Sequence, residues 1–431
     1  MRAAFLPHLH AGVARVLAPF IASAQLHLLL AYGVFLASYL VFAIGRFPGT
    51  KIDRPAAAVI GAALMFAFRA ITPSEAIRSI DYATIVLLAS MMLIVSSLHF
   101  AGFFEWVAKL VVKFVSPAHL LPGVIFTSGI LSAFLVNDVI CLMMAPLLLK
   151  ICRQFSKRPT PYLLALATAS NIGSAATITG NPQNILIGSI SAIGYRQFIS
   201  ALAPVSLIGL FIDWAVLHWL YPDRGLAPSA APPAIAVENS GTDRQRLAFP
   251  LVILAGVLAG FFAGVSPALV AAIGGALLLV RRSIHPENIY KEIDWPLLVF
   301  FIGLFLIIGA AQQAGIAQQM LAIAERLNLH NGWIFSGVVA LLSNVVSNVP
   351  AVMLLKSLVP QFQNATHFWL LLAMASTLAG NLTITGSIAN IIVVEKARKE
   401  VEITFADYAR VGIPVTLATL AVGVLWLRCF A

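Results

Sequence analysis

Two stretches of small polar residues interrupt an otherwise apolar sequence and carry most of the groups that could bind an ion. The first runs Ser170-Asn-Ile-Gly-Ser-Ala-Ala-Thr-Ile-Thr-Gly-Asn-Pro-Gln-Asn184, and the second runs Ala379-Gly-Asn-Leu-Thr-Ile-Thr-Gly-Ser-Ile-Ala-Asn390. Glycine and proline disfavour a continuous helix here. An unwound backbone frees carbonyl groups for Na⁺, and the helix N-terminus that follows offers N–H groups to an anion. The stretches therefore predict a site for a small anion and a coupling cation.

The predicted site draws on amide, hydroxyl and backbone groups from both stretches. We expect the substrate or ion ligands to be Asn171, Gly173, Ser174, Thr177, Thr179, Gly180, Asn181, Asn184, Asn381, Thr383, Thr385, Gly386, Ser387 and Asn390. Small polar residues also permit close packing between membrane helices, which is the structural alternative for either stretch alone. The presence of two related copies favours the binding role.

Two further polar points lie at the tips of predicted hairpins. Asn137 and Asn348 occupy equivalent tips and are candidate Na⁺ ligands together with neighbouring backbone carbonyls, and Ser347 adds a hydroxyl. Asp138 has no acidic counterpart, because Val349 stands at the equivalent position. A carboxylate at membrane depth is costly and marks a functional site, so we expect Asp138 to couple transport to H⁺ or Na⁺. A carboxylate satisfied by nearby backbone N–H groups is the structural alternative.

The composition places these segments in a membrane. Of the 431 residues, 60% are hydrophobic and 10% are charged, whereas a soluble domain has about 25% charged residues. The net charge of +10 fits cytoplasmic loops better than nucleic-acid binding. The 3 cysteines are too few for a disulfide framework. The chain lacks a GxxxxGK motif and the HExxH and GxSxG motifs, so we expect no enzyme and no cofactor, and a pump would need a separate ATPase subunit.

An internal repeat relates the two halves of the chain. Thr177-Ile-Thr-Gly180 recurs as Thr383-Ile-Thr-Gly386, and Ala101-Gly102 recurs as Ala314-Gly315. The predicted helical segments of the first half are 26–44, 55–70, 83–101, a hairpin at 120–151, 162–190 and 198–220. Those of the second half are 247–265, 266–281, 295–314, a hairpin at 332–360, 367–395 and 411–430.

The repeat predicts an all-α polytopic membrane protein with two inverted repeats of five transmembrane helices, each with a re-entrant hairpin and a broken helix. The first repeat covers 26–220, a Pro- and Gly-rich cytoplasmic linker covers 221–246, and the second repeat covers 247–431. Residues 1–25 fit an amphipathic segment lying on the membrane, with an extra span as the alternative. Paired broken segments in two halves are typical of secondary transporters.

Hairpin length and charge predict the topology. Each hairpin limb has about 15 residues and spans roughly 22 Å, which is short of the ~30 Å hydrocarbon core, so each hairpin enters and leaves on one side. Each half then crosses an odd number of times, and the halves are inverted. Most of the 27 lysines and arginines fall on one side, which is therefore cytoplasmic. We expect the C-terminus outside a bacterial inner membrane, and Asp213 in a structural hydrogen bond near the cytoplasmic end of its helix.

These motifs resemble the ion transporter superfamily, from about residue 26 to 430. The most specific parts are Leu135-Val-Asn-Asp138, Gly180-Asn-Pro-Gln-Asn184 and Ser347-Asn-Val-Pro350. The sequence looks closest to the branch of arsenite permeases, related sodium/proton antiporters and anion permeases, and is distantly similar to divalent anion/sodium symporters. The resemblance implies a carrier that is commonly a homodimer, with two opposed hairpins and two broken helices around one site. Arsenite-permease-like relatives carry an aspartate where this chain has Asn181.

Together these features predict a secondary active transporter. We expect it to carry a small inorganic or organic anion or oxyanion across the inner membrane, coupled to H⁺ or Na⁺, by alternating access, with membrane lipid around it. A Na⁺/H⁺ antiporter without an anion substrate is the alternative, because the same groups coordinate Na⁺. The sequence does not select a substrate.

Overall fold

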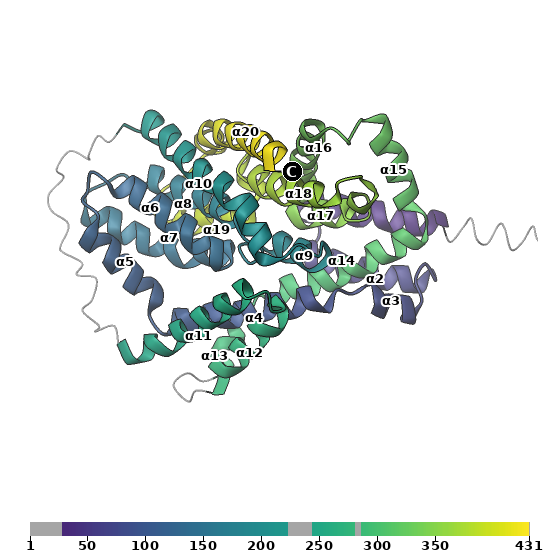
Figure 1. Ribbon diagram of the computed structural model, residues 1–431, viewed down its shortest axis with the longest axis horizontal. Helices are drawn as coiled ribbons and strands as arrows, with labels where there is room; N and C mark the ends of the chain where they lie inside the picture. Colours follow the sequence, from purple (N-terminus) through teal and green to yellow (C-terminus); the bar gives the residue numbers. More distant parts are fainter. Residues whose placement is uncertain (1–27, 223–243, 281–285, 431) are drawn as a thin grey trace, which may run out of the picture. The chain divides into compact units, whose positions relative to one another are not determined.

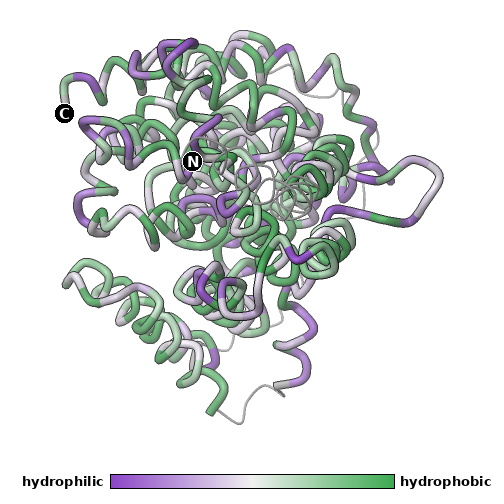
Figure 2. The backbone as a smooth tube through the Cα atoms, turned by 90° about the vertical axis from the view of Figure 1, so that its right-hand side faces the viewer, coloured by the Kyte–Doolittle hydropathy of each residue, from purple (hydrophilic) through white to green (hydrophobic). Residues whose placement is uncertain are grey.

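The computed structural model describes residues 28–222, 244–280 and 286–430. The predicted segment 1–25 and most of the linker 221–246 lie outside these ranges. Regular structure in the described ranges is helical, with one isolated β-bridge between Arg46 and Asp53. Apolar residues run along most of the helices (Figure 2).

The helices follow the predicted segments closely. The first half contains Leu28–Ile44, α2 (Arg54–Ala67), α3 (Pro73–Ser79), α4 (Tyr82–Phe100), α5 (Phe103–Phe114), α6 (Leu120–Phe134), α7 (Asn137–Gln154), α8 (Pro159–Ser174), α9 (Pro182–Ile190) and α10 (Tyr195–Leu220). The second half contains α11 (Arg244–Phe262), α12 (Pro267–Val280), α13 (Pro286–Lys291), α14 (Trp295–Gln313), α15 (Ile316–Arg326), α16 (Gly332–Val346), α17 (Asn348–Leu355), η1 (Val359–Gln361), α18 (Ala365–Ala379), η2 (Ile384–Gly386), α19 (Ile388–Ala397) and α20 (Phe405–Phe430).

Among the described residues, four helices are long and apolar enough to cross a membrane by themselves. They are Tyr82–Phe100, Tyr195–Leu220, Trp295–Gln313 and Phe405–Cys429. Other apolar helices are shorter, including α6, α16 and α18. Short apolar helices suit segments that are interrupted or that stop within a membrane, since a full crossing needs about 20 residues.

Four short helices were not predicted, and they occur at equivalent places in the two halves. The amphipathic helices α5 and α15 follow the long apolar helices α4 and α14. Both begin after a glycine with a left-handed backbone, Gly102 (φ 80°) and Gly315 (φ 84°). Glycine adopts this conformation without a Cβ penalty, which explains why the Ala-Gly pair recurs. The other two, α3 and α13, each begin at a proline.

The chain divides into two compact units, and each unit draws on both halves of the sequence. One unit contains described residues 28–81 and 296–323. Within it, the Phe42 and Phe300 rings meet edge to face at 5.2 Å, and Gly303 packs directly against the backbone of Ala58. The other unit contains the remaining described residues and holds both polar stretches.

Within this larger unit, α8 packs against α6, α7, α10 and α19, and α18 packs against α16, α17 and α20. The first group lies side by side in Figure 1. The two polar stretches therefore lie among the most deeply buried helices, since almost every residue of α8 and of α18 after its first turn is buried.

Candidate functional site

Both polar stretches are breaks between two helices. We call residues 175–181 the first break, between α8 and α9, and residues 380–387 the second break, between α18 and α19. The first break ends at Asn181, whose extended backbone and side chain cap α9, with Oδ1 accepting from Asn184 N at 2.9 Å. Pro182 follows at the first helical position, where a missing N–H costs nothing. The sequence thus specifies a helix restart at this point.

The second break restarts its helix differently. Ser387 has the extended backbone of an N-cap residue but makes no capping bond with its side chain. Its hydroxyl instead donates to Asn171 Oδ1 at 3.0 Å, across to the other polar stretch. No proline follows. The second half therefore uses its cap residue to join the second break to α8.

One asparagine after each break holds the unwound backbone in the same way. Asn184 Nδ2 donates to Ser174 O (3.2 Å) and Thr177 O (3.0 Å). Its counterpart Asn390 donates from Nδ2 to the two equivalent carbonyls, Gly380 O (2.7 Å) and Thr383 O (3.1 Å). Each asparagine thus satisfies two carbonyls that the break removes from helical bonding.

The two stretches bond to each other reciprocally. Asn171 Nδ2 donates to Asn390 Oδ1 at 2.9 Å, and the equivalent pair, Thr377 Oγ1 and Asn184 Oδ1, lie 3.4 Å apart. Asn181 Nδ2 donates to Thr377 Oγ1 at 3.2 Å, which is the counterpart of the Ser387-to-Asn171 bond. Each of these two contacts therefore has a mate in which the halves exchange roles.

Asn171 is the centre of this network. Its Nδ2 donates to Asn381 Oδ1 (2.8 Å) as well as to Asn390, and its Oδ1 accepts from Asn137 Nδ2 (2.9 Å) as well as from Ser387. All these side chains are buried. An amide has two donors and one acceptor oxygen with two lone pairs, so Asn171 is fully satisfied. It positions its neighbours and has no remaining capacity for a ligand in this conformation.

The first hairpin tip, between α6 and α7, reaches the first break. Asn137 N donates to Gly180 O at 3.0 Å. Asn137 is 3% exposed, and its buried side-chain oxygen has no hydrogen-bond partner among the described residues. A buried carbonyl oxygen without a donor is costly. It is therefore a candidate ligand for a cation or for a substrate hydroxyl.

The second tip, between α16 and α17, makes the equivalent contact through a side chain. With its nitrogen facing the acceptors, the Asn348 amide donates to Ser343 Oγ (2.7 Å), Ser376 O (3.1 Å) and Gly386 O (3.2 Å). Ser347 precedes it with φ 78°, a conformation that non-glycine residues rarely adopt. Both tips are therefore bonded to the glycine of the neighbouring break.

Asp138 is bonded to the start of α19. It lies in the first turn of α7, is partly buried, and accepts from the Ala389 backbone N–H at the start of α19. Asp294 lies close enough to repel it electrostatically. Within the described residues, Asp138 forms no salt bridge. A helix N-terminus stabilises a negative charge, so α19 supplies the partner that a side chain does not.

The predicted threonines lie beside the network. Thr177 Oγ1 donates to Ala133 O on α6, and Thr179 Oγ1 lies 3.0 Å from the Tyr195 hydroxyl. Thr383 Oγ1 donates to Asn344 Oδ1 at 3.0 Å, and Thr385 Oγ1 lies 3.3 Å from the Thr383 hydroxyl. These hydroxyls join each break to its hairpin or to α10 and do not converge on Asn171 and its partners.

The network also includes residues that the sequence analysis did not single out. Thr377 receives bonds from Asn181 and from Gln183 Nε2 (3.2 Å). The repeat alignment could have pointed to Thr377, because it occupies the position equivalent to Asn171. Thr168 links the network to Asp213: its carbonyl accepts from Asn381 Nδ2 (3.0 Å), and its hydroxyl bonds Asp213 Oδ2 (2.9 Å). The fully buried Asp213 thus has the hydrogen bond expected of it.

Comparison with known proteins identifies the group to which this architecture belongs. The family model for the citrate transporter CitMHS matches residues 39–379. The chain belongs to this citrate transporter family. It is a transporter and a multi-pass membrane protein rather than an enzyme, and the resemblance to the anion permease group is confirmed.

Relatives of known name support this family. The chain is 31% identical to the 46 kDa membrane protein of Mycobacterium leprae, over 93% of this chain and 98% of the relative. It is 28% identical to the silicon efflux transporter LSI3 of Oryza sativa subsp. japonica, over 91% and 96% of the two chains. It is 26% identical to the putative transporter arsB of Dictyostelium discoideum, over 86% and 87%.

A solved structure shares the fold. The Alcanivorax borkumensis YdaH transporter, described as having an unusual topology, matches with a TM-score of 0.53 at 13% identity, over 95% of this chain and 98% of that chain. Identity at this level relates the two folds and carries no information about the substrate.

Proposed function

We propose that this protein is a secondary active transporter for a small anion or oxyanion, coupled to H⁺ or Na⁺, and that the two breaks form its binding site. The observation that carries the proposal is the reciprocal bonding around the two breaks, in which Asn171 on α8 and Thr377 on α18 exchange roles. Two inverted repeats with unwound segments at their interface are a recurrent design for alternating access. The family is named for citrate transport, and one relative is named as a silicon efflux transporter.

The chemistry around the breaks suits an anion and a cation together. The N-termini of α9 and α19 begin beside the network and would favour a negatively charged group. The unpartnered Asn137 Oδ1 and the Asp138 carboxylate supply oxygen ligands at the first hairpin tip. Hard cations such as Na⁺ prefer oxygen ligands, and a carboxylate can instead carry a proton. Asp138 is therefore our coupling residue.

The membrane arrangement is part of the same proposal. The halves 26–220 and 247–431 would be inverted repeats, with the linker on the cytoplasmic face of a bacterial inner membrane and the C-terminus outside. The bias of basic residues toward one side supports this orientation.

Asp138→Asn tests the coupling role in reconstituted vesicles. Candidate solutes such as citrate, arsenite and silicic acid would be screened in radiolabelled or chemically assayed form under imposed pH or Na⁺ gradients. We expect the variant to lose gradient-driven accumulation by about tenfold or more, while exchange of the anion at equal ion concentrations continues. Val349→Asn, which places the same amide at the equivalent second tip, is the matched control. Unchanged gradient-driven accumulation in Asp138→Asn would remove Asp138 from the coupling step.

A Na⁺/H⁺ antiporter is the second candidate, favoured by the same oxygen ligands at the first hairpin tip. It predicts Na⁺ flux driven by a pH gradient when no anion is present. The proposed anion carrier predicts that this flux depends on the anion. A flux that is unaffected by adding any of the screened anions would select the antiporter.

A further inference from the structure

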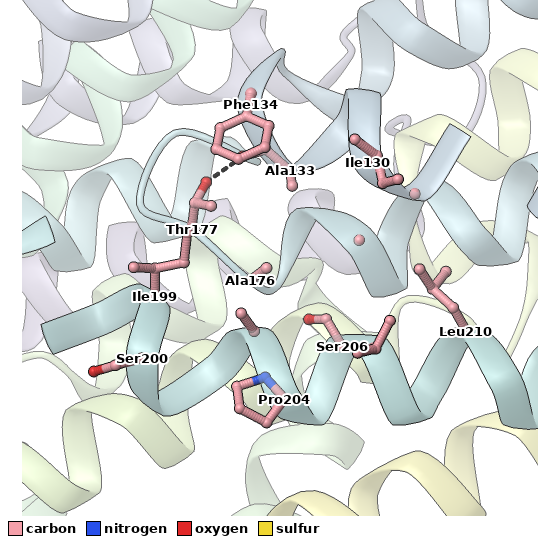
Figure 3. A pocket seen from close by; sticks show the side chains of 14 residues that line it. Ile130, Ala133, Phe134, Ala176, Thr177, Ile199, Ser200, Pro204, Ser206 and Leu210 are labelled. Carbon is pink, nitrogen blue, oxygen red and sulfur yellow. Dashed lines mark hydrogen bonds between the residues drawn. The ribbon is translucent and has the colours of Figure 1, made fainter. Parts of the chain in front are cut away.

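An apolar cleft of about 590 Å³ lies beside the start of the first break. One wall is α10 and the other is α6, and the start of the break forms its floor (Figure 3). Its volume lies within the usual range of small-molecule pockets. The lining is Gly129, Ile130, Ala133, Phe134, Gly173, Ala176, Thr177, Ile199, Ser200, Ala203, Pro204, Ser206, Leu207 and Leu210.

Several small residues line this cleft, and some of them have larger counterparts in the second half. The helices α10 and α20 have 26 residues each and an internal proline at the same place, Pro204 and Pro414, so Ala203 is equivalent to Ile413. The other equivalent positions follow from aligning the two hairpins and the two polar stretches. Gly129, Ala133, Gly173 and Ala176 are replaced in the second half by Ala340, Asn344, Ala379 and Leu382. The lining of the cleft therefore differs in side-chain size from the equivalent positions of the second half.

The mouth of the cleft is bordered by exposed apolar side chains. Ile130 is 58% exposed and Leu207 is 52% exposed, and Phe211, one turn along α10, is 50% exposed. The helix α10 is among those long and apolar enough to span a membrane. In a multi-pass membrane protein such side chains face hydrocarbon, so lipid chains are the molecules next to this opening.

The lining excludes the transported solute as the occupant. Its polar groups are few, and an anion moved from water into an apolar cleft would lose its hydration without compensation. Ser206 Oγ is buried and has no partner among the described residues. As a helix serine, it can rotate to bond a carbonyl of the preceding turn, so it does not require a polar ligand.

We propose that this cleft binds one acyl chain of a membrane lipid. The chain would fill the space left by the small residues and would contact α10, α6 and Ala176 at the start of the break together. Filling a void in an otherwise close-packed interior recovers dispersion contacts that an empty cleft lacks. The bound chain would lie against the Thr177-to-Ala133 bond, which joins the break to its hairpin.

Photolabelling tests the proposal on the full chain in vesicles. The vesicles would contain phosphatidylethanolamine and phosphatidylglycerol, with a small fraction of phosphatidylglycerol that carries a diazirine at mid-chain. Labelled peptides would be mapped by mass spectrometry. We expect cleft peptides of α6 and α10 to be labelled about fivefold more than the exposed face of α20 around Leu417 and Leu425, and to saturate as the photolipid fraction rises.

Variants that copy the second half should close the cleft. Ala203→Ile combined with Ala176→Leu should lower labelling of the cleft peptides about fivefold, to the level of α20. Ala203→Ile alone, a milder change, should lower it in the same direction if the double variant does not fold. Ala215→Ile adds the same side chain to an exposed position of α10 and should leave cleft labelling unchanged. Labelling that rises linearly with photolipid, or that Ala203→Ile leaves unchanged, would overturn the proposal. The readout is independent of transport.

Discussion

The first break is closed in this structure and the second is partly open. Every residue from Ala175 to Asn181 is buried, whereas Leu382 to Ile384 are half-buried and Thr385 is exposed. The two segments share the Thr-Ile-Thr-Gly motif and the asparagine that follows it. Equivalent sequences thus adopt unequal exposure. In a carrier built from two repeats, such inequality is expected of one state of an alternating pair, because the opposite state exchanges the roles of the halves.

The supporting bonds are also unequal. Asn171, on the first stretch, makes four side-chain bonds of 2.8 to 3.0 Å. Its counterpart Thr377 makes three contacts of 3.2 to 3.4 Å. A hydroxyl has a single proton, whereas an amide donates twice and accepts twice. Asn171 therefore makes more and shorter bonds in the network than its counterpart Thr377.

Alanine substitutions at Asn171 and Thr377 should give the largest difference in transport activity between the two halves. Asn171→Ala would leave the polar groups of Asn137, Asn381, Asn390 and Ser387 buried with fewer partners, at about 1–3 kcal/mol for each group that stays unsatisfied. We expect transport to fall about 100-fold and the unfolding temperature to drop, whereas Thr377→Ala should lower transport about tenfold. Initial uptake rates in vesicles and thermal unfolding in detergent would measure both.

Asn171→Asp keeps the shape and removes two donors, and it serves as the control for packing. It should resemble Asn171→Ala in transport. Equal losses for Asn171→Ala and Thr377→Ala would show that the two stretches carry the network equally, which contradicts the inequality of their bonds.

The next largest difference should lie between the stability costs of substituting Gly180 and Gly386, the glycines of the shared Thr-Ile-Thr-Gly motif. A Cβ on Gly180 would collide with the backbone of Ser174, which cannot move away without changing the break. A Cβ on Gly386 would lie 2.7 Å from Asn344 Oδ1, a side-chain atom that can turn aside, and 2.9 Å from Gly380 O. We expect Gly180→Ala to cost about 3 kcal/mol of unfolding free energy and Gly386→Ala about 1 kcal/mol. Thermal unfolding of the two variants would measure these costs. Gly337→Ala is the control, because a Cβ at Gly337 on α16 meets nothing within 4 Å. A larger loss of stability for Gly386→Ala than for Gly180→Ala would contradict this prediction.

The sequence predicted the helices and the breaks well because both have local causes. Runs of apolar residues mark the helices, and Pro182 with Asn181 marks the restart of α9. The partners of each polar group could not be predicted. Thr377 was missed because a lone threonine in an apolar helix usually bonds its own backbone. The direction of Asp138 toward α19 also depends on tertiary packing, which brings Ala389 beside it.

The helices α5 and α15 were missed for a related reason. Their amphipathic sequences contain charged residues such as Lys109 and Arg326, which resemble the loops between spans. The repeat of the glycine before each was visible, but only the backbone shows that both glycines have the same left-handed conformation and that a helix follows. A conserved spacing within one chain can thus mark a structural element whose type the composition does not disclose.

The smallest effect is expected in cysteine labelling, which tests most directly why the two breaks differ in exposure. Thr385→Cys and Thr179→Cys place thiols at equivalent positions, of which the first is exposed and the second is buried. Both variants would be made with Cys429→Ser, because Cys429 is the exposed native thiol and Cys141 and Cys152 are buried. In the state described here, a water-soluble maleimide should modify Thr385→Cys about tenfold faster than Thr179→Cys. Imposing an ion gradient that favours the opposite state should narrow or reverse that ratio, since a change in population alters both exposures in opposite directions. If the ratio stayed fixed under every gradient while transport remained active, the unequal exposure would be a permanent difference between the halves. The second break would then be an open rim of the site, and only the first break would move during transport.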